Sequence, residues 1–130
     1  MKIPQTLVDF VSRRDVAKVL ATVNADGSAN IGPKASTQVY DDESLAFAEF
    51  VGKHNLENVQ RDQRITIAAI DWEKREGYRF VGQAEVHQSG PIFEKLRERL
   101  PRPPKAVVRL LVDRIDILSP AQAGETLQAG

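Results

Sequence analysis

The amino-acid sequence predicts a mainly β fold with a few helices, in which six antiparallel strands form a closed barrel. Six segments carry the branched, aromatic or alternating apolar residues that are typical of strands, and turns or short helices separate them. The segments between them are too short for the crossover connections that a doubly wound parallel sheet needs. Because an open sheet exposes unpaired edge strands, closure into a barrel is the favoured arrangement.

Length and composition are those of an ordinary single-domain globular protein. The chain has 130 residues, of which 42% are hydrophobic and 28% are charged, and its 18 basic and 18 acidic residues balance. A zero net charge does not steer the protein towards nucleic acid, and no apolar run is long enough to span a membrane. The first residues lack the apolar core of a secretory signal, so we expect one cytoplasmic domain over residues 1–130. The absence of cysteine excludes disulfides, thiolate nucleophiles and thiolate metal sites.

The first predicted elements are a helix and a strand that leads into a hairpin. Apolar residues at helical spacing predict an amphipathic helix over residues 4–14, and Pro4 suits its first turn because the missing N–H is not needed there. The branched residues of 16–23 then predict a strand. The Asp26-Gly27 pair that follows favours a tight hairpin, since glycine adopts positive φ at little cost.

The second strand, expected over residues 29–39, is interrupted by Gly32-Pro33. A proline cannot donate to a hydrogen-bonded ladder, so this strand must bulge, bend or lie at an edge there. The remaining elements follow from alternation, from helical spacing and from the proline cluster after residue 100. They are strand 45–50, helix 56–61, strands 64–72 and 78–87, helix 91–100, strand 106–118 and a C-terminal tail, 119–130.

Four consecutive residues ahead of the short predicted helix, Gly52-Lys53-His54-Asn55, have the chemistry of an anion site. The glycine permits a tight turn, Lys53 and His54 bring a cation and an imidazole, and Asn55 suits the capping position. The unpaired N–H groups of a helix N-terminus would lie beside them, a combination that suits phosphate. A solvated turn with an ordinary helix cap is the alternative, because the segment lacks the glycine pattern of a P-loop.

The segment Pro33-Lys34-Ala35-Ser36-Thr37 is a second candidate site. A strand disturbed by proline leaves backbone N–H and C=O groups free to pair with the edge of a ligand, and Ser36 and Thr37 add hydroxyl groups. A bulge that serves only the curvature of the barrel is the alternative interpretation.

Other constellations give little support for catalysis. The two histidines, His54 and His87, have no metal-binding spacing, and no serine lies in a nucleophile elbow. The acidic turn 41–43 and the basic stretch 95–105 are typical of solvated surface, and no aromatic residues interleave with the basic ones to stack on nucleic acid. The sequence therefore assigns no catalytic residue, and the catalytic residues are unknown.

With these residues in view, the chain resembles the FMN-binding split-barrel family related to pyridoxamine 5'-phosphate oxidase, in particular its short, barrel-only members. The segments that carry the resemblance are VAKVLATVNADGSANIGPKAS, LAFAEFVGKHNLENVQRDQRITIAAID and GYRFVGQAEV, and it extends over residues 3–118. It implies a homodimer of six-stranded split β-barrels, with two FMN molecules at the subunit interface.

The resemblance also implies roles for particular residues. In the family, backbone groups after the proline of the second strand face the flavin, and the end of the following strand lies along the ribityl chain. Basic and hydroxyl side chains that open the short helix hold the phosphate. The corresponding flavin residues are Lys34, Ala35, Ser36 and Thr37, the ribityl residues are Ala48 and Glu49, and the phosphate residues are Lys53, His54 and Asn55.

The resemblance implies an FMN-dependent oxidoreductase that transfers hydride or electrons, with NAD(P)H or a small-molecule substrate as its partner. Vitamin-B6 oxidation itself is not expected, because this chain ends soon after its last strand, where the true oxidases add a C-terminal extension. Two alternatives stay open. In the first, the protein is a non-catalytic FMN carrier in electron transfer. In the second, the same barrel binds haem or a deazaflavin, and a haem would have His54 or His87 as its axial ligand.

Overall fold

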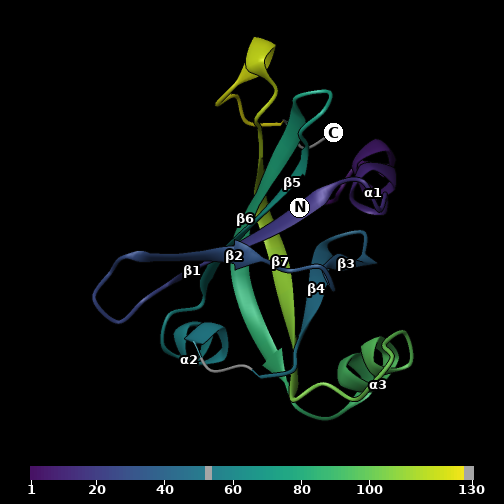
Figure 1. The fold of residues 1–130 in the computed structure, drawn as a ribbon, viewed down its shortest axis with the longest axis vertical. Coiled ribbons are helices and arrows are strands. Elements are labelled where there is room, and N and C mark those ends of the chain that lie inside the picture. Colours follow the sequence, from purple (N-terminus) through teal and green to yellow (C-terminus); the bar gives the residue numbers. More distant parts are fainter. Residues whose placement is uncertain (52–53, 128–130) are drawn as a thin grey trace.

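The computed structural model describes residues 1–51 and 54–127, which form one antiparallel sheet and a few helices (Figure 1). The strands are β1 (Ala17–Val23), β2 (Ala29–Pro33), β3 (Gln38–Asp41), β4 (Ser44–Glu49), β5 (Arg64–Asp71), β6 (Glu76–His87) and β7 (Ala106–Ile117). The helices are α1 (Gln5–Val11), α2 (His54–Arg61), α3 (Pro91–Arg97) and the 3-10 turn η1 (Pro120–Gln122). None of the helices in these described ranges is long and apolar enough to cross a membrane. The prediction of a mainly β, antiparallel fold is confirmed.

The split-barrel fold that the resemblance implies is confirmed, but the predicted number of six strands and the predicted closure of the barrel are wrong. The sheet has seven strands in the order β2-β1-β5-β6-β7-β4-β3, because the segment expected as one strand, 29–39, forms both β2 and β3. Pro33 ends β2, since it has no N–H to donate to a ladder. β2 lies at one edge of the sheet and β3 at the other, and these edges are not paired in the residues described. Residues 34–37, here called the crossing segment, therefore span the split between the two edges.

A close backbone approach joins the two longest strands, β6 and β7. Their register shifts at one point, where Val81 pairs with Arg114 but Gly82 pairs with Val112, so β7 carries one extra residue. A Cβ atom added to Gly82 would lie 1.9 Å from the carbonyl oxygen of Leu111. A side chain at this position would therefore collide with the backbone of β7.

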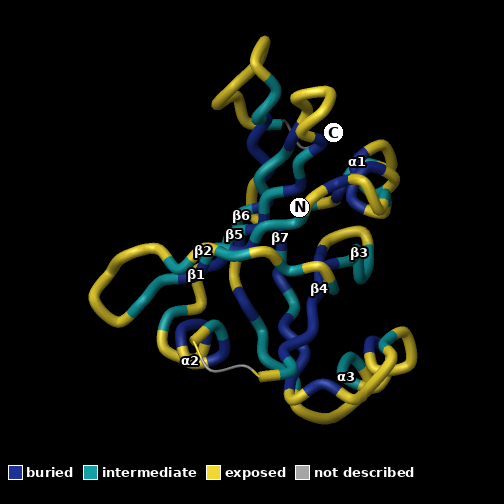
Figure 2. Tube along the Cα trace, viewed as in Figure 1, coloured by how far each residue is buried: buried dark blue, intermediate teal, exposed yellow. Residues whose placement is uncertain are grey.

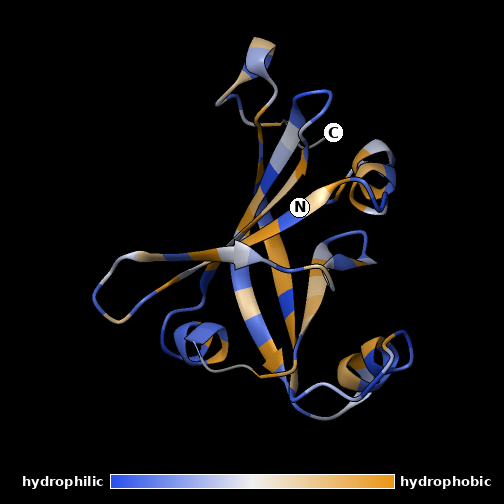
Figure 3. Ribbon diagram, viewed as in Figure 1, coloured by the Kyte–Doolittle hydropathy of each residue, from blue (hydrophilic) through white to orange (hydrophobic). Residues whose placement is uncertain are grey.

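The main hydrophobic core lies inside the curved sheet. Along the central strands, buried residues alternate with partly exposed ones in Figure 2, and hydrophobic residues alternate with hydrophilic ones in Figure 3. The largest fully buried side chains of this core are Leu20, Leu45, Phe47, Ile67, Phe80, Leu110 and Ile115. A smaller core lies on the other face, where Leu96 of α3 packs with Ala46 and Val107. β4 is consequently buried along its whole length, which anchors the strand that ends at the predicted ribityl residues.

The C-terminal tail, expected over residues 119–130, returns to β7 in the part that the structure describes. Leu127 N donates a hydrogen bond to Ile115 O at 2.7 Å. Thr126 Oγ1 donates to Asp116 Oδ1 at 3.1 Å, so the tail also contacts a buried carboxylate.

Acid should destabilise the protein in part through Asp116. Burial by itself raises the pKa of this carboxyl group, but hydrogen bonds from Arg79, Thr126 and Arg114 lower it below the ordinary value of 3.8. A pKa that is lower in the folded than in the unfolded state contributes stability above about pH 4, and this stability is lost as the pH falls through the folded-state pKa. The urea midpoint of Asp116→Asn should therefore fall less than that of the wild type between about pH 6 and about pH 3.

The control for this measurement is Asp113→Asn, which changes an exposed carboxylate on the same strand and should keep the wild-type pH dependence. An identical pH dependence for Asp116→Asn and the wild type would contradict the assignment.

Candidate functional site

The crossing segment has a backbone that is only partly hydrogen-bonded. Lys34 N donates to Lys18 O at 2.9 Å, and Thr37 N donates to Lys34 O at 3.1 Å, which folds the segment into a turn. Between these two donors, the N–H groups of Ala35 and Ser36 donate to no residue that the structure describes. The segment therefore offers two adjacent amide donors at the split of the barrel.

Side chains of the crossing segment contact the end of β4 through hydrogen bonds and an ion pair. Ser36 Oγ accepts a hydrogen bond from Ala48 N at 3.0 Å and donates to Ala48 O at 3.4 Å. Lys34 Nζ lies 2.7 Å from Oε1 of Glu49 in an ion pair that lacks the alignment of a hydrogen bond. The Glu49 side chain is only 4% exposed, so its charge depends on this cation for compensation. The structure thus brings together residues that the resemblance assigns to the flavin and the ribityl chain.

Thr37 carries a buried hydroxyl group that has no partner among the described residues. The residue is 5% exposed, and its Oγ1 atom makes no hydrogen bond there. An unsatisfied buried hydroxyl costs about 1–3 kcal/mol, so it is rare in native proteins. Together with the amides of Ala35 and Ser36, it is a third polar group at the crossing segment that a ligand could satisfy.

The predicted phosphate residues lie at the start of α2, but Lys53 is outside the described residues. His54 is exposed and is the first residue of the helix. Asn55 therefore lies inside the first turn, and the prediction that it caps the helix is wrong. Its Oδ1 atom instead accepts hydrogen bonds from Asn30 Nδ2 at 2.9 Å and from Thr22 Oγ1 at 3.3 Å. These two donors orient the amide, and its Nδ2 group donates to no residue that the structure describes.

A second amide, Asn58, fixes α2 against the β1–β2 hairpin, and sequence reasoning does not identify it. Asn58 is 5% exposed, and its Nδ2 group donates to Thr22 Oγ1 at 3.0 Å and to Asn24 Oδ1 at 2.9 Å. Arg61 donates to Asn58 Oδ1 at 2.9 Å, so every polar atom of this side chain is used. The one available signal was the helical spacing, which places Asn58 beside the apolar face of the helix.

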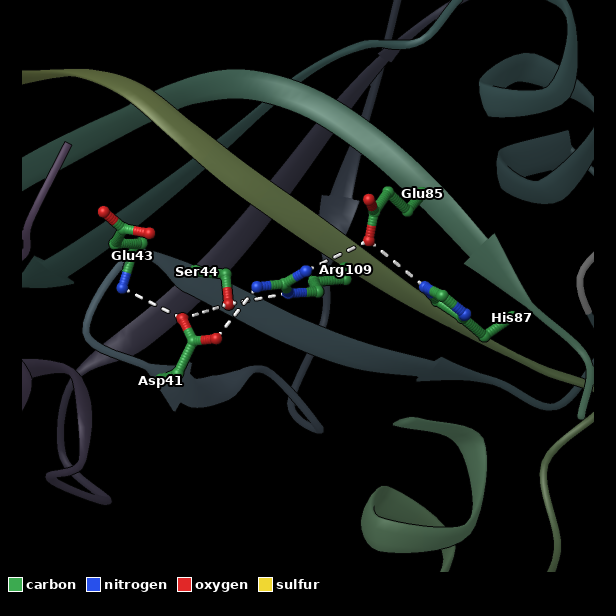
Figure 4. A network of polar contacts seen from close by, with 6 residues as sticks. All are labelled: Asp41, Glu43, Ser44, Glu85, His87 and Arg109. Atoms are coloured by element: carbon green, nitrogen blue, oxygen red, sulfur yellow. Dashed lines mark hydrogen bonds and ion pairs between the residues drawn. The ribbon is translucent and has the colours of Figure 1, made fainter. Parts of the chain in front are cut away.

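A second polar network surrounds Arg109 (Figure 4). The sequence does not predict it, because its members come from four different strands. Arg109 donates to Ser44 Oγ at 2.9 Å and to Asp41 Oδ2 at 2.8 Å. It also donates to Glu85 Oε1 at 3.2 Å, and the same oxygen lies 3.2 Å from His87 Nε2. Burial raises the pKa of Asp41, but hydrogen bonds from Ser44, a backbone N–H and Arg109 lower it below its ordinary value. The network joins β3, an edge strand, to the rest of the sheet.

The antiparallel sheet with two unpaired edges, bridged by the crossing segment, places the chain in the class of small split-barrel proteins. The family model described as pyridoxamine 5'-phosphate oxidase matches residues 3–119, and the chain belongs to this family. No curated protein matches the chain.

Several solved structures are similar to this one. HupZ from Group A Streptococcus is 34% identical, with a TM-score of 0.85, over 97% of this chain and 99% of that chain. A candidate pyridoxamine 5'-phosphate oxidase from Lactobacillus delbrueckii is 28% identical, with a TM-score of 0.78, over 88% of this chain and 93% of that chain. An FMN-binding protein from Syntrophomonas wolfei is 16% identical, with a TM-score of 0.73, over 88% of each chain, which shows a shared fold alone.

Proposed function

We propose that the protein is an oxidoreductase that binds FMN at the crossing segment, as a homodimer with two FMN molecules at the subunit interface. The observation that carries the proposal is the set of unsatisfied groups there: the N–H groups of Ala35 and Ser36 and the buried hydroxyl of Thr37. The polar edge of a flavin ring carries oxygens and nitrogens that accept hydrogen bonds from such donors. Membership of the family and the shared fold of an FMN-binding protein support FMN as the ligand.

The described residues fit the ring and ribityl parts of this cofactor. The amides of Ala35 and Ser36 donate to the ring edge, while Lys34, held by Glu49, places a cation beside it. Ala48 and Glu49, at the end of β4, border the ribityl chain. FMN supplies hydride or electron transfer when bound, and the protein binds and orients it. A reduced pyridine nucleotide in the cytoplasm is the proposed electron donor.

The phosphate of FMN is proposed to lie at the start of α2. Asn55 presents its Nδ2 group because its oxygen is already bonded to Asn30 and Thr22. Its neighbours in the sequence are the imidazole of His54 and the cation of Lys53. Backbone N–H groups of the first helical turn add to the attraction for an anion.

Replacing Asn55 with aspartate tests this placement, because it keeps the acceptor for Asn30 and Thr22 but puts a negative charge beside the phosphate. We expect Asn55→Asp to weaken FMN binding by about tenfold or more, as measured by quenching of flavin fluorescence. Riboflavin, which lacks the phosphate, should bind the variant and the wild type equally well.

The matched control is Gln60→Glu, which adds the same charge to an exposed position near the other end of α2 and should leave FMN affinity unchanged. If FMN binds Asn55→Asp as tightly as the wild type, the phosphate does not lie at this residue.

A further inference from the structure

A basic surface covers α3 and the loop that joins it to β7. Residues 94–105 hold five basic residues and two acidic ones, in a chain whose charges balance as a whole. The five basic residues are all exposed, and the loop is coloured as exposed along most of its length in Figure 2. They are Lys95, Arg97, Arg99, Arg102 and Lys105, here called the basic surface. Arg97 pairs with Glu94, and the other four form no ion pair with any residue that the structure describes.

Two cations of the basic surface are held against aromatic rings. The guanidinium of Arg102 lies 4.4 Å from the centroid of the Phe50 ring. Nζ of Lys95 lies 4.9 Å from the centroid of the Tyr40 ring. Such contacts restrict the side chains without neutralising their charge, so an anionic partner would meet partly ordered cations and bind at a lower cost in side-chain entropy.

The basic surface borders the place proposed for the cofactor. The backbone N–H of Lys105 donates to Glu49 O at 2.8 Å, which fixes the loop to the end of β4. Phe50, which carries Arg102 on its ring, follows Glu49 directly in the sequence. A molecule docked on the basic surface would therefore lie beside the residues proposed to border the ribityl chain.

Acidic residues gather at the opposite end of the same strand. The turn that leads into β4 contains the exposed carboxylates of Asp42 and Glu43, whereas the strand ends at the basic surface. Outside residues 94–105, the chain has more acidic than basic residues. This separation of charge would turn the basic surface towards an approaching acidic protein.

Exposed apolar residues accompany the cations. Val51, next to Phe50, is 79% exposed, and Pro103 of the loop is exposed as well. Apolar residues among arginines are typical of protein–protein interfaces. Nucleic acid fits less well, because the rings of Phe50 and Tyr40 each have a cation over them and are not free to stack on bases.

We infer that the basic surface docks an acidic electron-carrier protein, whose carboxylates contact Lys95, Arg97 and Arg102 and whose apolar centre contacts Val51. This inference rests on the proposed function, because FMN at the crossing segment would exchange electrons with the docked protein. Two oxidised one-electron carriers each take one electron through FMN. The reduced pyridine nucleotide that supplies both electrons is oxidised, and the proton of its hydride goes to solvent.

The first test compares two small redox proteins of opposite charge, the acidic iron protein rubredoxin and a basic cytochrome c. Rubredoxin should bind the full chain in isothermal titration calorimetry at about 20 mM salt, and its affinity should fall by about tenfold or more at about 200 mM salt. Cytochrome c should bind at least about tenfold more weakly than rubredoxin at low salt. The FMN-loaded chain, reduced with dithionite and freed of the excess, should reduce two rubredoxins per FMN.

The second test removes two charges of the basic surface. We expect Lys95→Gln/Arg102→Gln to weaken rubredoxin binding by about tenfold at low salt, with the far-UV circular dichroism spectrum of the wild type. The matched control is Lys74→Gln, which removes an exposed lysine in the turn before β6, at the end of that strand remote from α3 (Figure 1). It should bind rubredoxin as the wild type does.

Several results would overturn the inference. They are no binding of rubredoxin at low salt, equal affinities for rubredoxin and cytochrome c, and an affinity that does not change in Lys95→Gln/Arg102→Gln. A single-stranded oligonucleotide that binds more tightly than rubredoxin would assign the basic surface to nucleic acid instead. Binding without reduction of rubredoxin would contradict the electron-carrier role.

Calorimetry with and without FMN separates this inference from the proposed function. If the chain takes up no FMN but binds rubredoxin through the basic surface, the flavin proposal fails and the docking surface stands. If it binds FMN but not rubredoxin, the docking surface alone is wrong.

Discussion

Lys34→Met is expected to lower the free energy of unfolding by about 3 kcal/mol, because it leaves the buried carboxylate of Glu49 without its cation. Lys34 Nζ lies 2.7 Å from Glu49 Oε1, and the two side chains are 18% and 4% exposed. Removing one partner of a buried pair costs about 3–5 kcal/mol, and the partial exposure of Lys34 places this pair at the lower end. Urea denaturation monitored by far-UV circular dichroism measures the change.

A second variant separates the stability of this pair from its role in binding. In Lys34→Met/Glu49→Gln, no unpaired charge remains, so most of the lost stability should return. FMN affinity should stay below the wild-type value, because the cation beside the flavin is still missing. Lys105→Met, at an exposed lysine next to β7, is the control and should behave as the wild type does. Wild-type stability in Lys34→Met would show that the ion pair contributes nothing.

Gly82→Ala is expected to destabilise the protein by more than about 3 kcal/mol, a large part of the 5–15 kcal/mol that is typical of a domain. The added Cβ would lie 1.9 Å from Leu111 O and 2.9 Å from Leu111 C, so the backbone of β7 must move. This contact joins the two longest strands, where β7 carries its extra residue. Thermal unfolding should show a strongly reduced Tm or no folded state.

Gly32→Ala is the matched control for Gly82→Ala. It lies in an edge strand, where an added Cβ meets no atom of the described structure within 4 Å, so its stability should stay close to that of the wild type. A Gly82→Ala protein as stable as Gly32→Ala would show that the approach of β6 to β7 is not as close as described.

Local signals in the sequence predict most of the fold, and long-range pairing accounts for what they miss. The Asp26-Gly27 pair predicts the hairpin, and Gly27 has the positive φ of 89° that this turn requires. Pro33 predicts a disturbed or edge strand, and β2 is an edge strand that ends at this residue. The sequence does not reveal that the chain then crosses to the opposite edge, because the partners of β3 lie in β4 rather than in β1. The number of strands and the open form of the barrel both follow from this pairing of β3 with β4.

The same distinction applies to the candidate site. The resemblance predicts several of the cofactor residues, and the structure brings four of them together at the split of the barrel: Lys34, Ser36, Ala48 and Glu49. The roles of Asn55 and Asn58 depend on Thr22, more than 30 positions away, and no local pattern indicates these contacts. Arg109 is a stronger example, since its hydrogen bond to Asp41 joins residues 68 positions apart.

The most direct test of the central claim is native mass spectrometry of the full chain after incubation with FMN and removal of the excess. We expect a yellow protein whose principal ion has the mass of two chains and two FMN molecules. Mild denaturation should release FMN, identified by its own mass, together with the single chain of 14.5 kDa. A colourless protein whose mass shows no bound FMN would contradict the account.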